Sequence, residues 1–227
     1  MTITREVDDG IAVLTLDDGK VNAFDVDRFA ELDAALDDCV DDAAVVLCGR
    51  DGVFSAGLDR ELLSAPREEL TELAVALTRT TMRLWTEPRP VVAAATGHAI
   101  AAGTILALAC DHAIAAAGDY RWGLNETAIG LVLPQWVIAL ARTNVRADRL
   151  DGLILPGRLV GTDEALEVGY IDEIAPADEV RDRAIAHATA LTELSRHVYA
   201  ANKQRLRGAA AEAGMTEIVE QPPALRP

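Results

Sequence analysis

The stretch PVVAAATGHAIAAGTILALAC, residues Pro90 to Cys110, contains no Asp, Glu, Lys or Arg. It is long enough to cross a membrane as a helix, which takes about 20 predominantly apolar residues. The stretch is rich in alanine, however, and is interrupted by small or polar residues at Thr96, Gly97, His98, Gly103 and Thr104. It therefore predicts a buried strand followed by a buried helix, each covered on both sides by the rest of the domain.

Short apolar segments alternate with helical patterns on both sides of this stretch. Two β-type segments, Ile3 to Val7 and Ile11 to Leu16, are joined by Asp9-Gly10 and predict an antiparallel hairpin. Further strands are expected at Ala43 to Cys48, Val91 to Ala95, His112 to Ala116 and Tyr170 to Ile174. Helices are expected at Asp27 to Val40, Arg60 to Trp85 and Ile100 to Ala109, after Pro134, and from about Asp178 to Glu212. This alternation predicts an α/β fold with parallel strands joined by crossovers.

The composition makes some classes of partner and some cellular locations less favourable than others. The chain has 227 residues and a formal net charge of −16, which disfavours nucleic acid and anionic membranes as partners. Its three cysteines, Cys39, Cys48 and Cys110, have no CxxC spacing, and the first ten residues lack the apolar core of a signal peptide. We therefore expect a cytoplasmic protein with free thiols.

Three turns carry small residues where larger side chains are usual. They are Phe54-Ser-Ala-Gly-Leu-Asp59, Gly97-His-Ala-Ile-Ala-Ala-Gly103 and Trp122-Gly-Leu-Asn-Glu126. Small residues let a ligand approach the backbone, and the free N–H groups of a helix start can hold an oxyanion. Motifs of dinucleotide, P-loop, zinc-protease and serine-hydrolase sites are absent from the sequence, and its four histidines have no metal-ligand spacing, so no metal is expected.

Glu126 is the carboxylate within the third turn. One interpretation is a first-turn acidic residue that follows an Asn125 N-cap and stabilises a helix dipole. The other is the acid/base group of an enzyme, which the two preceding turns favour.

The chain resembles the crotonase (enoyl-CoA hydratase/isomerase) superfamily from about Val13 to Ala175. The resemblance lies in three motifs and in their order: GVFSAGLD, TGHAIAAGTILALACD and WGLNETAIGLVLPQW. The first and third strings are most similar to 3-enoyl-CoA to 2-enoyl-CoA isomerases. The resemblance implies a spiral of ββα units at residues 1–175 with the acyl-CoA site. It also implies a C-terminal helical extension at residues 176–227 that mediates trimerisation, as a homotrimer or dimer of trimers.

The resemblance also implies roles for individual residues. The backbone N–H groups of Ala56 and Ala102 are expected to hold the thioester oxygen. The family usually has glycine at the second position, and an alanine there demands a compatible φ. Coenzyme A, present only as part of the substrate, is expected to bind along loops that contain Lys20, Val21, Ala23, Ser55 and Leu58. Four residues are expected to line the acyl pocket: Ile105, Trp122, Pro134 and Trp136. For the last three, a place in the core is the alternative.

A hydratase of this family carries two glutamates, and one of the two positions here is Ile105. Water addition shares its proton transfers between two carboxylates, whereas moving a double bond needs one, so the sequence favours an isomerase with Glu126 as sole acid/base. Two alternatives stay open. The first is a hydratase whose second carboxylate comes from Glu61 or Glu72, and the second is a catalytically silent acyl-CoA-binding protein.

The remaining polar residues have simpler expectations. Cations that can meet an anionic CoA ester are Lys20, Arg60, Lys203 and Arg207, although Lys203 is also typical of a solvated surface charge or of a residue serving a neighbouring subunit. His98 is expected to be packed or hydrogen-bonded rather than catalytic. Asp59 and Asp111 are expected to cap or bridge turns.

Overall fold

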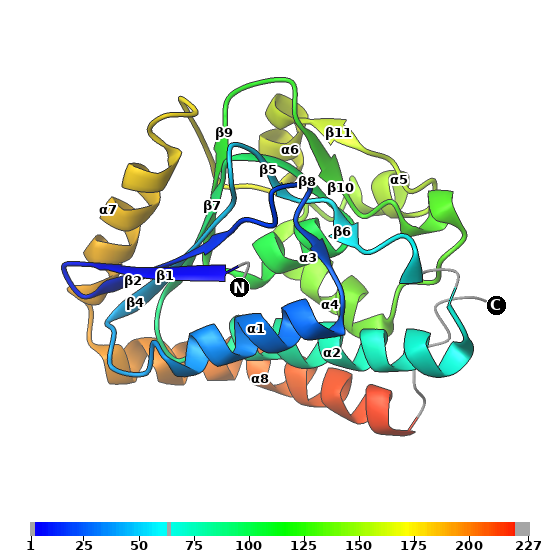
Figure 1. Ribbon diagram of the computed structural model, residues 1–227, viewed down its shortest axis with the longest axis horizontal. Helices are drawn as coiled ribbons and strands as arrows, with labels where there is room; N and C mark the ends of the chain where they lie inside the picture. Colours follow the sequence, from blue (N-terminus) through cyan, green and yellow to red (C-terminus); the bar gives the residue numbers. More distant parts are fainter. Residues whose placement is uncertain (1–2, 63–64, 221–227) are drawn as a thin grey trace.

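The computed structural model describes residues 3–62 and 65–220, which form two larger β-sheets and one two-stranded sheet, with helices packed around them (Figure 1). The larger sheet has six strands. In spatial order they are β1 (Ile3–Asp8), β2 (Ile11–Leu16), β4 (Ala44–Cys48), β7 (Val91–Ala95), β9 (His112–Ala116) and β12 (Glu173–Ala175). The hairpin of β1 and β2 is antiparallel as predicted, and the other pairs are parallel.

Each of three consecutive central strands is followed by a strand of a second, four-stranded sheet. Its spatial order is β11 (Val160–Gly161), β10 (Arg121–Gly123), β8 (Gly97–Ile100) and β5 (Gly52–Ser55). The chain therefore passes from β4 to β5, from β7 to β8 and from β9 to β10 before it enters a helix. These steps repeat one ββα unit, which is the expected spiral. A separate two-stranded sheet lies beside the first turn of the spiral. It pairs β3 (Ala23–Phe24) with β6 (Gly57–Leu58).

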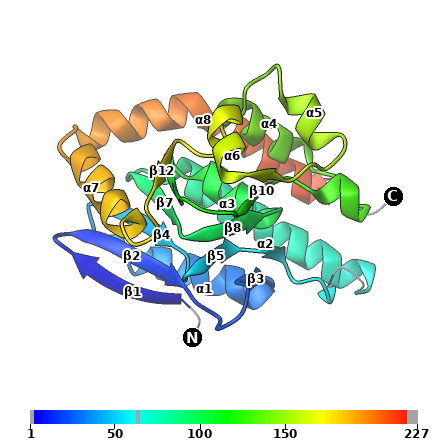
Figure 2. The ribbon, with the colours of Figure 1, turned by 90° about the horizontal axis from the view of Figure 1, so that it is seen from above.

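Helices cover both faces of the larger sheet (Figure 2). One face packs against α7 (Val180–Thr192), and the other faces a core that includes α1 (Val26–Asp37), α2 (Arg67–Thr86), α3 (Ala102–Ala109) and α4 (Gln135–Asn144). Every residue of β4, β7 and α3 is buried, which explains the uncharged run from Pro90 to Cys110 as interior structure. Within the described residues, no helix is long and apolar enough to span a membrane.

Four further elements complete the part of the chain that the structure describes. They are η2, a short 3₁₀ helix (Glu126–Ile129), α5 (Leu150–Ile154), α6 (Thr162–Val168) and α8 (Arg196–Glu220). The long helix α8 lies along α2 and also contacts α4 (Figure 1). The C-terminal helices thus pack on the same chain's core. The predicted division at residue 175 and the trimerisation role stay predictions, and residues 221–227 of the predicted extension lie outside the described residues.

Five predicted boundaries need correction. The helix expected to run to Val40 ends at Asp37, with its C-cap at Asp38. The helix expected from Arg60 begins at Arg67 after an N-cap at Pro66, because the residues before a proline disfavour helical backbone. Ile100 belongs to β8 rather than to α3, and the strand expected from Tyr170 begins at Glu173. The second C-terminal helix runs to Glu220 instead of Glu212.

Candidate functional site

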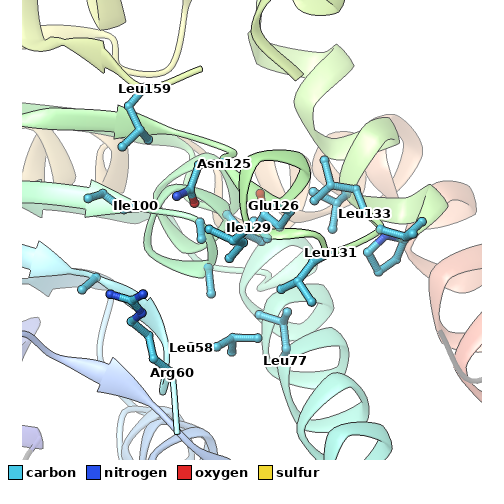
Figure 3. A pocket seen from close by; sticks show the side chains of 17 residues that line it. Leu58, Arg60, Leu77, Ile100, Asn125, Glu126, Ile129, Leu131, Leu133 and Leu159 are labelled. Atoms are coloured by element: carbon cyan, nitrogen blue, oxygen red, sulfur yellow. The ribbon is translucent and has the colours of Figure 1, made fainter. Parts of the chain in front are cut away.

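A cavity of about 310 Å³ lies between the first turn of the spiral, the N-terminus of α3 and η2 (Figure 3). Most of its walls are aliphatic. The lining residues are Ala56, Leu58, Arg60, Leu77, Ile100, Ala101, Ala102, Ile105, Asn125, Glu126, Ile129, Leu131, Val132, Leu133, Pro134, Val137 and Leu159. Such a cavity, apolar with few polar groups, is typical of a small-molecule site.

Glu126 is 7% exposed and lines this cavity. Its Oε2 atom is buried and has no hydrogen-bond partner among the described residues. Burial raises the pKa of Glu126 from 4.5 to about 7, because removal from water disfavours the charged carboxylate. A carboxyl group with a pKa near neutrality can both take and return a proton.

The interpretation of Glu126 as a helix-start charge does not fit this geometry. Glu126 begins η2, which is only four residues long, and Asn125 makes no side-chain capping hydrogen bond. A dipole-stabilising acid would be exposed on a longer helix, where it is worth about 0.3–1 kcal/mol. The enzyme interpretation of Glu126 is therefore favoured.

The N-terminus of α3 faces the cavity through Ala101 and Ala102. Ala102 is the first residue of α3, where backbone N–H groups have no partner within the helix. Its alanine side chain fits helical backbone, and the unusual conformation falls instead on Ala101, whose φ is +52°. Such a φ is rare for a residue with a side chain and is often found at functional sites.

Hydrogen bonds tie the α3 turn to the segment that carries Glu126. The Ala101 N–H donates to Gly123 O at 2.9 Å. Thr104 Oγ1 donates to Ala99 O at 2.7 Å and accepts from Gly123 N at 3.0 Å. These bonds couple β8, α3 and β10, so they fix the third turn against the second.

The expected role of Ala56 as an oxyanion donor is wrong. The Ala56 N–H donates to Val21 O at 2.9 Å, so it is already used within the fold. Sequence alone did not reveal this bond because its acceptor lies in a loop more than thirty residues earlier in the chain.

The Leu58 N–H, unlike the Ala56 N–H, is not directed at the segment that contains Val21 and β3. Asp59 N donates to Phe24 O at 2.9 Å, and N–H directions alternate along a strand, so the Leu58 N–H points away from β3. Leu58 and Ala102 both line the cavity. A Cβ atom on Gly57 would lie 3.3 Å from Ala102 N and 2.8 Å from Ile100 O, which shows how closely the two turns meet.

The residues expected along the CoA portion have different environments. Ser55 is fully buried, and its Oγ donates to Asn22 O at 2.7 Å and accepts from Gly57 N at 3.1 Å. Ser55 therefore shapes the turn, and its expected cofactor contact is wrong. Lys20 and Val21 are exposed, and Ala23 is half-buried beside the turn in β3.

The predicted wall of the acyl pocket is partly correct. Ile105 and Pro134 line the cavity. Trp122 and Trp136 do not, because both are buried in the hydrophobic core. Trp136 packs against α8, where a Cβ on Gly214 would lie 2.9 Å from its own Cβ. The two tryptophans fill the core, as the simpler interpretation held.

The candidates for a second carboxylate lie elsewhere. Glu61 and Glu72 line a separate acidic depression together with Asp25, Asp27 and Asp59. Among the described residues that line the main cavity, Glu126 is the single acid. The structure thus contradicts Glu61 and Glu72 as partners of Glu126.

Two of the four expected cations are used internally. Lys203 is 5% exposed, and its Nζ lies 2.6 Å from Asp111 Oδ2, while Arg207 Nη1 lies 2.7 Å from Asp111 Oδ1. Lys203 is therefore not a solvated surface charge, nor is it free to serve a neighbouring site. Arg60 lines the cavity and makes no ion pair within the part of the chain that the structure describes.

The structural roles expected for three polar residues are confirmed. His98 Nδ1 accepts from the Arg121 N–H at 3.0 Å, and His98 does not line the cavity. Asp59 Oδ1 accepts from the Glu61 N–H at 2.9 Å, and Asp111 Oδ2 accepts from Val91 N at 2.8 Å. Across residues 3–62 and 65–220, no cluster of His, Cys, Asp and Glu has a metal-binding arrangement.

Sequence reasoning gave no pocket role to Asn125 or to the Leu58 N–H. The sequence predicted Asn125 only as a helix cap, yet this residue lines the cavity, and its Oδ1 is buried without a partner in the described structure. The strand-like position of Leu58 directly after Gly57 was the available signal for its outward N–H, since N–H directions alternate in strands.

Comparison with known proteins identifies the family. Residues 6–221 match the enoyl-CoA hydratase/isomerase family. A probable enoyl-CoA hydratase of Mycobacterium avium is 35% identical to this chain, over 96% of this chain and 83% of the relative. The mouse mitochondrial enoyl-CoA delta isomerase 1 is 30% identical, over 89% of this chain and 72% of the relative. The crystal structure of an enoyl-CoA hydratase/isomerase family protein from Pseudomonas syringae superimposes with a TM-score of 0.94 at 28% identity, over 99% of this chain and 98% of that one.

These similarities confirm the predicted crotonase-type α/β fold and the expectation of an enzyme. The relatives carry names from both activities, hydratase and isomerase, so the match defines the family and not the reaction. The ββα spiral and the matched residues lead to one conclusion: this chain belongs to the enoyl-CoA hydratase/isomerase family.

Proposed function

We propose that the protein is an acyl-CoA double-bond isomerase that converts 3-enoyl-CoA to 2-enoyl-CoA. One observation carries this proposal. Glu126 is the single carboxylate among the described residues that line the cavity, and its buried Oε2 has no partner. With a pKa of about 7, the group is divided between its base and acid forms near neutral pH.

The chemistry needs one proton-transfer group. Glu126, as a carboxylate, removes a proton from C2 of the 3-enoyl thioester, and the electron pair spreads over C2 to C4 and the thioester oxygen. The protonated Glu126 then delivers the proton to C4, the double bond forms between C2 and C3, and the carboxylate is regenerated. No water enters the product, and the site returns to its starting state.

The negative charge that develops on the thioester oxygen needs hydrogen-bond donors. We assign this role to the backbone N–H groups of Leu58 and Ala102. Their orientation supports the assignment, because the first points away from β3 and the second lies at the start of α3. Preorganised donors of this kind are worth about 10²–10³ in kcat each.

Substrate binding in this proposal uses only the thioester, so coenzyme A arrives with the acyl group and no separate cofactor takes part. Lys20 and Arg60 are the cations that we assign to the phosphates of CoA, since Lys203 and Arg207 are paired with Asp111. Their local charge offsets a net charge of −16. Assembly as a homotrimer or dimer of trimers and a cytoplasmic location stay predictions.

A hydratase is disfavoured because water addition shares proton transfers between two groups. Ile105, which lines the cavity, has no proton to give, and Glu61 and Glu72 lie in another depression. A silent binding protein is disfavoured because a buried, unpaired carboxyl is costly to keep without a function.

Product analysis tests the proposal. The purified protein is incubated with trans-3-hexenoyl-CoA and, separately, with trans-2-hexenoyl-CoA. The products are separated by chromatography, and their masses are measured by mass spectrometry. We expect 2-hexenoyl-CoA of unchanged mass from the first and no hydrated product from the second. A product one water heavier identifies a hydratase, and binding without any product identifies a silent protein.

A further inference from the structure

Two histidines stack face to face where α7 meets the larger sheet. His112 is the first residue of β9, and His187 lies near the middle of α7. The centroids of their rings are 3.9 Å apart, and the ring planes differ by only 7°. We call these two residues the histidine pair. Because α7 covers the face of the sheet opposite α3, which carries part of the cavity, the proposed reaction gives the pair no task (Figure 2).

The histidine pair has few contacts that would compensate for added protons. Both side chains are half-buried, and His112 Nε2 is buried without a hydrogen-bond partner among the described residues. His112 Nδ1 lies 3.7 Å from Asp172 Oδ2, beyond hydrogen-bond range, and that oxygen already accepts from Ala113 N at 2.8 Å. The Asp172 side chain is 51% exposed, so water weakens its attraction for a protonated ring. Stacking of neutral rings is therefore the main interaction of the pair.

Within the described structure, the other groups that face α7 carry little charge. The core under α7 is mainly apolar, and its titratable members are Cys48 and Tyr120. Burial raises the pKa of Cys48 to about 11, so this thiol stays neutral. From β12, Glu173 Oε1 lies 2.8 Å from Arg183 Nη1 of α7, so its charge is already paired. Three exposed charged residues lie near the start of α7, the first of them paired with Glu6 of β1: Arg181, Asp182 and Arg183.

Burial and the neighbouring ring lower the pKa of His187. Removal from water disfavours the charged imidazole, and His112 adds to this effect, whereas Glu173 and Asp172 act in the opposite direction. The docked position of α7 therefore favours a neutral His187. The resulting stability is fully present above the ordinary pKa of 6.5 and is lost as the pH falls through the lowered value.

Apolar packing alone holds α7 weakly. Its buried residues are Val180, Ala184 and Ala188, and alanine side chains bury little area. The next helix, α8, is held more firmly, because Lys203 Nζ lies 2.6 Å from Asp111 Oδ2. Elements with few buried apolar contacts open locally at a lower cost than the core. We therefore expect α7 to be able to leave the sheet while α8 stays in place.

We propose that the histidine pair is a pH-sensitive contact that keeps α7 on the sheet while its rings are neutral and lets α7 detach locally when both rings carry protons. Two like charges about 4 Å apart repel each other even in water, and partial burial strengthens the repulsion. Detachment exposes the apolar face formed by β4, β7 and β9. The inference does not depend on the isomerase reaction, because neither histidine lines the cavity.

Hydrogen–deuterium exchange measured by mass spectrometry tests this proposal. Protection factors of α7, and of α2 as an internal reference, are measured from about pH 7.5 to about pH 5, which lies above the usual range of carboxyl groups. Each is corrected for the intrinsic exchange rate at that pH. We expect the protection of α7 to fall relative to that of α2 by about fivefold or more, the effect of two unit charges at this separation in bulk water. Glu126 titrates in the same range, but its effect on global unfolding is common to both helices.

Variants of two histidines separate the pair from other groups. His187→Phe keeps a flat ring that can stack on His112 but takes up no proton, so the protection of its α7 relative to α2 is expected to be independent of pH. The matched control is His197→Phe at an exposed position of α8, which is expected to keep the wild-type pH dependence. If phenylalanine lowers the protection of α7 at neutral pH, His187→Gln, which is neutral and smaller, replaces it.

Two results would overturn the inference. The first is a wild-type α7 whose protection changes with pH only as much as that of α2, which would indicate global rather than local opening. The second is an unchanged pH dependence in the His187 variant, which would assign the effect to other groups such as Asp172 and Glu173. Neither result bears on the isomerase proposal, which the hexenoyl-CoA products test separately.

Discussion

Two buried carboxylates in this protein have opposite environments. Asp111 accepts hydrogen bonds from Val91 N, Lys203 Nζ and Arg207 Nη1 and joins the start of β7 to α8. Glu126 lines the cavity with an Oε2 atom that has no partner among the described residues. A fully satisfied buried charge holds elements together, whereas an unsatisfied one is available for reaction.

The largest expected effect tests the reactive member of the pair. Glu126→Gln keeps the shape of the side chain but removes its proton chemistry, so we expect kcat on 3-hexenoyl-CoA to fall by about 10²–10⁴. Binding of a saturated acyl-CoA, measured by calorimetry, is expected to be unchanged. A variant that retains wild-type turnover would show that another group transfers the proton.

The next prediction concerns the structural member. Asp111→Asn leaves Lys203 buried without its counter-charge, so we expect the free energy of unfolding to fall by about 3–5 kcal/mol, measured with urea. The matched control is Asp148→Asn, which breaks an exposed ion pair with Arg146 and is expected to change stability little. Equal effects of the two substitutions would contradict the contrast between buried and exposed pairs.

The burial of Glu126 also predicts that the stability of the protein depends on pH. Burial holds the pKa of Glu126 at about 7, against 4.5 in the unfolded chain, so the folded state favours the neutral carboxyl. The contribution of Glu126 to stability is therefore fully present below pH 4.5 and is lost as the pH rises through about 7. The difference between wild type and Glu126→Gln in unfolding free energy is expected to shift by about 3 kcal/mol between these limits.

Urea unfolding of both proteins across this pH range measures that shift. The free energy of unfolding of the Glu126→Gln variant is expected to increase relative to that of the wild type as the pH rises. A difference that stays constant with pH would mean that Glu126 is not desolvated as the cavity geometry requires.

The smallest expected effect concerns backbone strain beside Glu126. Ala101 has a φ of +52°, which glycine adopts without steric cost. Ala101→Gly is therefore expected to stabilise the protein by about 1 kcal/mol, because relief of strain exceeds the added freedom of the unfolded chain. The melting temperature measures this change. A lower melting temperature would show that the methyl group of Ala101 packs usefully against the first turn.

Much of this structure was predictable from local sequence patterns. The Asp9-Gly10 turn predicted the hairpin, and the uncharged run from Pro90 to Cys110 predicted buried elements, because burial on both faces removes the usual alternation of apolar and polar residues. Pro66 marked the true start of α2, but the apolar pattern was extended past it to Arg60. The role of Glu126 was predictable because two turns with small residues precede it in the chain.

The errors at the site have a common physical cause. The N–H of Ala56 is bonded to Val21 O, and the charge of Lys203 to Asp111, and both bonds join segments far apart in the chain. The buried state of Trp122 and Trp136 likewise depends on which elements pack against them. Local patterns report propensity and periodicity, but they do not report tertiary partners.

The central claim is that one buried carboxyl moves the proton from C2 to C4, and isotope transfer tests it most directly. We would follow a single turnover of 3-hexenoyl-CoA carrying two deuterium atoms at C2, in ordinary water, and locate deuterium in the product by NMR. Because Glu126 is only 7% exposed, its proton is expected to exchange slowly with water while substrate fills the cavity. The account predicts deuterium at C4 in a substantial share of the product, whereas a product without deuterium at C4 at any pH would contradict it.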